Sequence, residues 1–136
     1  MAASKRRAEA RPARLRAALL IALLLAACAT PDTLVIDVPR AATEHAIAPY
    51  EFHEECATLE VGDRIDYRFE AKAPVAFQIY YKEGVAFVST VSRDGVQESA
   101  GIFNVPAPRR YCVRWDAGQQ GALVDFRIRV SRPKKQ

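Results

Sequence analysis

Residues 63–71, DRIDYRFEA, decide the fold class, because apolar and charged side chains alternate in them with a period of two. Ile65, Tyr67 and Phe69 fall on one face of an extended chain. The charged residues between them, such as Asp66, fall on the other face. This alternation is typical of a β-strand that has one buried face.

The same alternation recurs further along the chain, and turn-forming residues separate the repeats. The further alternating stretches are residues 75–81, 111–115 and 124–130. Glycine, proline and aspartate mark turns at residues 62–63, 73–74, 83–84, 94–95, 106–108 and 118–121. Short strands without a helical period predict an all-β fold, a small antiparallel β-sandwich of jelly-roll type with about eight strands. We expect this domain to span residues 50–132, followed by a basic tail at 133–136.

The N-terminal residues 1–27 have the composition of a cleaved signal peptide. A basic start precedes an apolar run at 17–27, AALLIALLLAA, which is shorter than the roughly 20 residues that span a bilayer. A buried helix is the alternative, but this run is apolar on every side. The Arg6-Arg7 pair only weakly suggests twin-arginine export, because no apolar residues follow it closely, so a general secretory route is favoured.

The overall net charge of +4 is concentrated in that leader and does not indicate nucleic-acid binding. Residues 1–27 contain six basic side chains and one acidic one, so the rest of the chain has a net charge of −1. A nucleic-acid partner would need a basic surface on the folded domain. We therefore expect no nucleic acid among the partners.

The leader ends in Leu25-Ala26-Ala27-Cys28, which resembles the lipobox of bacterial lipoproteins. The resemblance implies a diacylglycerol on the Cys28 thiol, cleavage before Cys28, and a fatty acyl chain such as palmitate on the new amino group. Several acyl chains are enough for stable anchoring to a lipid bilayer. Ala29 is not the aspartate that this family associates with inner-membrane retention, so an outer membrane facing the periplasm is expected. An ordinary signal peptide with an incidental Cys28 is the alternative.

Residues 28–49 contain three spaced prolines and are interpreted as the lipidated N-terminus and an extended tether. The segment TLVIDV at 33–38 could instead form a short edge strand, which would shorten the tether.

Cys56 and Cys112 are candidates for a disulfide, provided that Cys28 carries lipid. Export would place them in an oxidising compartment, where disulfides persist. The strand alternation puts both cysteines on the outward face, and outward residues on neighbouring strands lie close enough to be bridged. A domain of this size has a marginal core and would gain from such a crosslink.

Residues 53–84 together with 101–118 resemble the GOLD domain of the p24 (emp24) cargo-receptor family. The shared features are Cys56 beside acidic residues, the turn at 62–63, Gly101 before Phe103, and the Tyr111-Cys112 pair. The resemblance implies a jelly-roll-like sandwich with a Cys56–Cys112 disulfide that binds proteins or lipids. Cargo transport is not implied, because the sequence does not show the coiled coil, transmembrane helix and cytosolic tail of that family.

Residues suited to catalysis or to metal binding are sparse. His53 lies beside Glu54, Glu55 and Cys56, but the other histidine, His45, falls in the expected tether, and zinc needs three or four ligands. We therefore expect no catalytic residues, cofactor or metal. The alternative is an envelope metal-binding protein or enzyme that uses His53 and nearby carboxylates.

The remaining candidate is a partner surface on the outward face of the strands. Tyr80 and Arg114 alternate outward, and aromatic and arginine side chains are enriched at binding hot spots. Scattered, solvated surface residues are the alternative interpretation. The sequence thus predicts a membrane-anchored envelope lipoprotein, a non-enzymatic binding or structural module with an envelope protein, glycan or lipid as partner.

Overall fold

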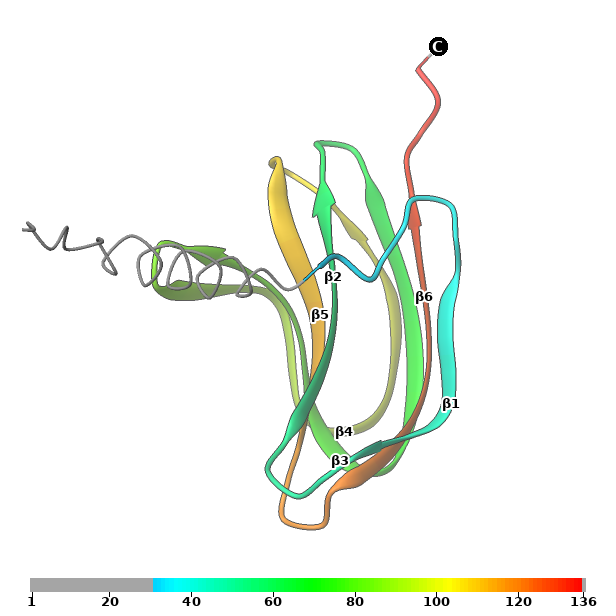
Figure 1. The fold of residues 1–136 in the computed structure, drawn as a ribbon, viewed down its shortest axis with the longest axis vertical. Helices are drawn as coiled ribbons and strands as arrows, with labels where there is room; N and C mark the ends of the chain where they lie inside the picture. Colours follow the sequence, from blue (N-terminus) through cyan, green and yellow to red (C-terminus); the bar gives the residue numbers. More distant parts are fainter. Residues whose placement is uncertain (1–30, 136) are drawn as a thin grey trace, which may run out of the picture. The chain divides into compact units, whose positions relative to one another are not determined.

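The computed structural model describes residues 31–135, which form an all-β domain of antiparallel strands (Figure 1). The signal peptide and Cys28 lie outside the described residues. The strands are β1 (Arg40–Ile47), β2 (Phe52–Leu59), β3 (Arg64–Glu83), β4 (Ala86–Asn104), β5 (Arg109–Ala117) and β6 (Ala122–Ser131). Within the described part of the chain no helix is long and apolar enough to cross a membrane.

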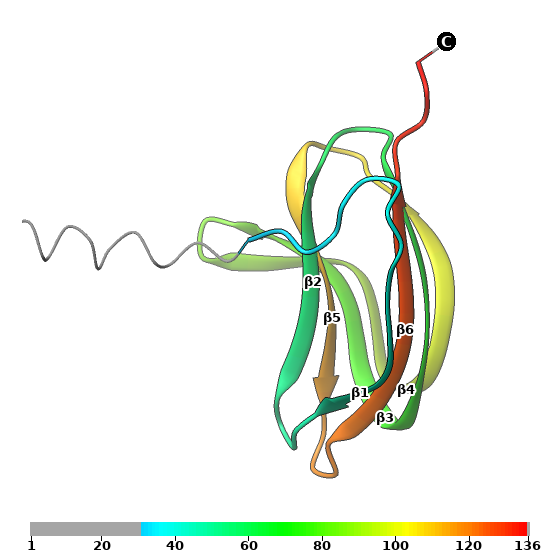
Figure 2. The same ribbon diagram turned by 45° about the vertical axis from the view of Figure 1, so that its right-hand side comes forward.

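Strand β3 connects the two layers of the domain. Its N-terminal half pairs with β6, which pairs with β1, and its C-terminal half pairs with β5, which pairs with β2. On its other side β3 pairs with β4 along its whole length. The sheet curls around a buried core, so that β1 and β6 lie on one side of it and β2 and β5 on the other (Figure 2).

The four alternating stretches supply the core, as the sequence predicts. Ile65, Phe77, Val113 and Ile128 are at most 1 % exposed, and Trp115 packs among the aromatic rings between the layers. The prediction of an antiparallel all-β sandwich is therefore confirmed. Each of these strands contributes every second side chain to the interior, which is the geometry of a sheet with one buried face.

Two of the predicted turns are bends inside long strands. Residues 73–74 fall where the pairing of β3 with β4 shifts register, and β3 continues beyond Pro74. Gly95 has a φ of 63° and lies at a second irregularity, within β4. Proline and left-handed glycine are both typical of β-bulges. Residues 31–135 accordingly form six strands, two of them long and bent, in place of about eight short ones.

The expected tether is largely part of the domain. Leu34 is buried, the backbone N–H groups of Thr33 and Leu34 both donate to the Cys56 carbonyl, and β1 pairs with β6. Residues 33–38 make isolated bridges at Val35, Ile36 and Val38 and do not form a full strand. The prediction of a free tether as far as residue 49 is therefore wrong for residues 32–47, because their backbone groups find partners on the sheet.

The C-terminal boundary of the domain is fixed by an ion pair. The Arg132 guanidinium donates two hydrogen bonds of 2.9 Å to Asp63, whose side chain is almost fully buried. These bonds from Arg132 lower the pKa of the Asp63 carboxyl. After Arg132 the basic residues Lys134 and Lys135 are exposed and outside any strand.

Candidate functional site

Cys56 and Cys112 form the expected disulfide. They are direct partners in the pairing of β2 with β5, with a Cα–Cα distance of 4.1 Å and an S–S distance of 2.08 Å. Both side chains point to the outer face, where Tyr80 covers them, so each cysteine is less than 5 % exposed. The crosslink joins the edge strand β2 to the body of the sheet.

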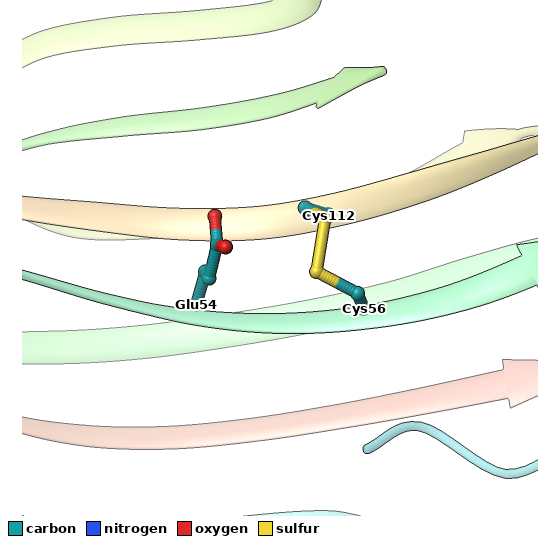
Figure 3. Close-up of side chains that lie close together, drawn as sticks. All are labelled: Glu54, Cys56 and Cys112. Carbon is teal, nitrogen blue, oxygen red and sulfur yellow. A yellow bond between two sulfur atoms is a disulfide. The ribbon is translucent and has the colours of Figure 1, made fainter. Parts of the chain in front are cut away.

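Glu54 lies beside the disulfide on β2, and its carboxylate approaches both sulfur atoms (Figure 3). A cluster of one carboxylate and two cysteines would suit a soft metal ion if the sulfurs were thiolates. The two sulfurs are bonded to each other, so neither provides a thiolate ligand. The Glu54 carboxylate instead accepts a hydrogen bond from the Tyr80 hydroxyl.

Tyr80 points to the outer face, as the alternation predicts, but it is only 2 % exposed. The Phe87 ring, the disulfide and Glu54 surround it. Burial and the hydrogen bond to Glu54 raise the pKa of Tyr80 to about 12, so the hydroxyl stays a neutral donor. The prediction that Tyr80 offers an exposed contact surface is wrong, since neighbouring side chains close over it.

The Arg114 side chain lies against the sheet, held by Asp116 on the same strand and by Phe52 on β2. Its guanidinium makes a two-pronged ion pair with Asp116, with a shortest distance of 2.7 Å, and lies over the Phe52 ring at 3.7 Å. The hydrogen bonds to Asp116 raise the pKa of Arg114. One fifth of its side chain remains exposed, so Arg114 offers a partner a small and already neutralised surface.

The two histidines, which the sequence places far apart, meet inside the domain. The ring centroids of His45 on β1 and His53 on β2 are 4.0 Å apart, and His53 stacks against Trp115 and Phe126. Burial and the neighbouring His53 lower the pKa of His45. The imidazoles thus close the gap between the two edge strands.

Glu55 lies beside these histidines and was not predicted as a site residue. It has no exposed side-chain surface, and its Oε1 accepts hydrogen bonds of 2.9 Å from His53 and 3.0 Å from Arg40. Its Oε2 is buried without a hydrogen-bond partner among the described residues. The alternation in β2 indicates that Glu55 points inward, because it has the same parity as the inward-facing Ala57 and Leu59.

Glu55 makes the free energy of unfolding of the domain depend on pH. Burial alone would raise the pKa of this carboxyl, but the interactions with His53, Thr33 and Arg40 outweigh it and lower the pKa from 4.5 to about 2. The stabilisation is therefore complete above about pH 4.5 and is lost as the pH falls towards 2. Its upper limit is about 3 kcal/mol.

We expect Glu55→Gln to remove this dependence. The free energy of unfolding of the unaltered chain should fall relative to that of the variant between pH 4.5 and 2, by up to about 3 kcal/mol. Urea unfolding followed by tryptophan fluorescence at several pH values measures both. Parallel pH profiles for the two proteins would show that Glu55 is not the titrating group.

The β3–β4 hairpin projects beyond the body of the domain on the left of both views (Figures 1 and 2). Gly84, whose φ is 62°, and Val85 form its two-residue turn, and the pairing of β3 with β5 ends before the tip is reached. Val85 is 99 % exposed and Phe87 is 59 % exposed. The sequence predicted the turn at 83–84, but it gave no signal that the tip stands clear of the core.

The outer edge of β4 has no strand partner among the described residues, since β4 pairs with β3 alone. Residues 86–92, AFVSTVS, contain neither charge nor proline. Natural edge strands usually carry such residues because they prevent pairing with another chain. The charged residues Arg93 and Asp94 and the irregularity at Gly95 follow directly after this stretch.

Comparisons with known proteins add little beyond the fold. No protein-family model matches the sequence, and a search of curated proteins also finds no match. Similar solved structures include PliG of Aeromonas hydrophila, a periplasmic inhibitor of g-type lysozyme, at 11 % identity and a TM-score of 0.47, covering 69 % of this chain and 83 % of that one.

Two further structures are similar in the same way. The pre-peptidase C-terminal domain of a Bacillus anthracis collagenase is 9 % identical, with a TM-score of 0.49, covering 76 % of this chain and 99 % of that one. A CBM4 structure is 14 % identical, with a TM-score of 0.39, covering 67 % and 77 %. The likeness carries nothing about function, and the class of a small, disulfide-bonded, antiparallel β domain rests on this chain's own strands.

Proposed function

We propose that this chain is an envelope lipoprotein, anchored through an acylated Cys28, whose β domain binds a partner protein by adding one of the partner's strands to the free edge of β4. The observation that carries the proposal is the free outer edge of the uncharged stretch 86–92 at the projecting hairpin, where the side chains of Val85 and Phe87 are exposed. The resemblance to the GOLD domain, a protein- or lipid-binding module, is in keeping with this role.

Strand addition fits the geometry of this edge. A free edge offers backbone donors and acceptors to an extended segment, and side chains beside it give the contact its specificity. Phe87 is positioned for this, because the Tyr80 ring and the Lys82 ammonium hold its ring against the outer face while more than half of it stays exposed. The partner that this edge fits is an extended, uncharged segment of an envelope protein.

A binding role is favoured over catalysis by the contacts of the two histidines. His53 is hydrogen-bonded to Glu55 and stacked on aromatic rings, and His45 lies against it. None of these contacts is with a hydroxyl or thiol nucleophile of the described residues, which a Ser-His or Cys-His mechanism needs.

The proposed anchor would hold the domain close to its membrane. Asp32 is docked on the sheet, where it accepts a hydrogen bond of 2.8 Å from the Thr58 N–H and pairs with Arg110 at 2.8 Å. Only four residue steps separate Cys28 from Asp32, which corresponds to a reach of at most about 14 Å. The domain would then lie close to the membrane and would not be attached through a long flexible tether.

We expect Phe87→Lys to abolish partner capture at this edge. The added charge would be desolvated beside the incoming strand, and the exposed ring would be lost. Chemical crosslinking in the native envelope, followed by mass spectrometry of the purified tagged chain, compares this variant with Gln119→Lys, which adds the same charge in the β5–β6 loop.

The control should retain the partner adduct that Phe87→Lys loses. Equal adducts from both variants would contradict strand addition at the hairpin. An adduct composed of two copies of this chain alone would contradict a separate partner protein.

Metal binding is a second candidate function, for which the observation is the meeting of two imidazoles beside the buried Glu55 carboxylate. His45, His53 and Glu55 offer nitrogen and oxygen ligands of the kind that zinc accepts. Arg40 opposes this role, because its guanidinium already occupies Oε1 of the same carboxylate. Stoichiometric zinc or copper in the purified protein, lost in His53→Ala, would place this candidate ahead of strand addition.

A further inference from the structure

Two arginines lie side by side on the outer face of the layer that β1, β6 and the N-terminal half of β3 form, away from the hairpin. Arg68 on β3 and Arg127 on β6 are direct partners across the strand pair. On either side of them the same row continues with small residues, Ala100 on β4 and Ala41 on β1. The two guanidinium groups therefore rise from a row whose other members are too short to cover them.

Neither arginine is neutralised by a described residue. Both are exposed, and neither forms a hydrogen bond or ion pair within residues 31–135. Like charges directly opposite each other on a sheet are unfavourable, because their Cβ atoms lie only about 5 Å apart. Other arginines of the domain differ in this respect, since Arg132 pairs with Asp63 and Arg114 pairs with Asp116.

The surface around this pair is hollowed. Three shallow hollows of about 460, 330 and 290 Å³ are all lined by Arg68, and the two larger ones also by Arg127. The largest hollow is lined as well by Asp66 and Arg129, which are partners across the same strand pair. The exposed Ile102 gives the same hollow an apolar wall.

We propose that Arg68 and Arg127 together bind a phosphate group of an envelope ligand. A guanidinium presents a planar fork of donors that matches the oxygens of phosphate, and two forks facing one group make charge-assisted hydrogen bonds from both sides. This site lies apart from residues 86–92 of β4 and does not depend on the proposed strand addition.

Phosphate fits the pair better than a carboxylate does. A phosphate monoester carries about −1.5 to −2 charges and three acceptor oxygens at neutral pH, so one group can neutralise both arginines. A carboxylate carries one charge and occupies one fork. The next row along the face is acidic, with Glu70 opposite both Glu98 and Asp125, and it confines the anion to the arginine row.

The test is a titration with inorganic phosphate, followed by the ¹⁵N NMR signals of the arginine Nε–H groups in the folded domain. We expect the Arg68 and Arg127 signals to shift and the double variant Arg68→Gln/Arg127→Gln to bind phosphate at least about tenfold more weakly. The double variant Lys134→Gln/Lys135→Gln removes the same charge from the exposed tail and should bind as the unaltered domain does.

Three results would contradict the proposed phosphate site or its preference for phosphate. Equal weakening in both double variants, or no shift at Arg68 and Arg127, would overturn the site, and equal affinity for acetate would overturn its preference for phosphate. Vesicles of phosphatidic acid, whose headgroup is a phosphate monoester, and of phosphatidylcholine identify the source of the group. Binding to the first alone that requires Arg68 and Arg127 assigns a lipid headgroup, whereas a response to inorganic phosphate without vesicle binding assigns a free or soluble phosphate ligand.

Discussion

Replacing Cys56 and Cys112 together by alanine is expected to lower the free energy of unfolding by about 4 kcal/mol. The crosslink joins residues 56 positions apart, so it removes many conformations from the unfolded chain. A domain of about 100 residues has a total stability of only about 5–15 kcal/mol, so this loss is a large fraction of it. The variant should therefore unfold at a much lower denaturant concentration.

Denaturant unfolding of the oxidised chain, the reduced chain and the double variant measures the effect. The reduced chain and the double variant should both be destabilised, and Cys56 and Cys112 of the native chain should resist alkylation until a reductant is added. Cys28→Ala in the mature domain is the matched control and should leave the midpoint unchanged. A loss below about 1 kcal/mol would contradict the role of the disulfide as the main crosslink of the fold.

Replacing Cys28 by serine is expected to move nearly all of the protein from the membrane fraction to the soluble fraction. Each buried CH₂ group of an acyl chain contributes about 0.8 kcal/mol to membrane binding, so removing all the chains leaves no comparable anchor. Fractionation of cells that produce either form measures the change. The intact mass of the purified protein reports acylation at the same time.

High salt separates this anchor from electrostatic attachment. The unaltered protein should stay with the membrane at high ionic strength, because acyl insertion is not screened, whereas attachment by the basic tail would be released. A Cys28→Ser protein that has lost its leader but remains membrane-bound, or an unaltered protein whose mass lacks the acyl groups, would contradict the lipoprotein proposal.

The strands that supply the core could be predicted because burial follows the period of two. Ile65, Phe77, Val113 and Ile128 alternate with polar residues, and the structure buries all four. Strand β1 escaped prediction because its sequence, RAATEHAI, lacks that alternation and only Ile47 is buried. Its place comes from backbone pairing with β6, which leaves no trace in side-chain hydrophobicity.

The candidate site was harder to predict because it depends on what covers each side chain. The outward direction of Tyr80 followed from the alternation, whereas its burial depends on Phe87 of the neighbouring strand β4 and on the disulfide between β2 and β5. His45 and His53 come together because the sheet curls and brings its two edges face to face. Local sequence patterns give a side chain's direction, but closure of the sheet decides its surroundings.

The central claim is that the projecting hairpin contacts a partner protein, and site-specific photocrosslinking in the native envelope tests it most directly. A photoreactive amino acid replaces Val85, which is 99 % exposed, and in a matched chain it replaces the exposed Gln119 in the β5–β6 loop. The proposal predicts a discrete adduct with a second protein from position 85 and none from position 119. No adduct from position 85, or the same adducts from both positions, would contradict it.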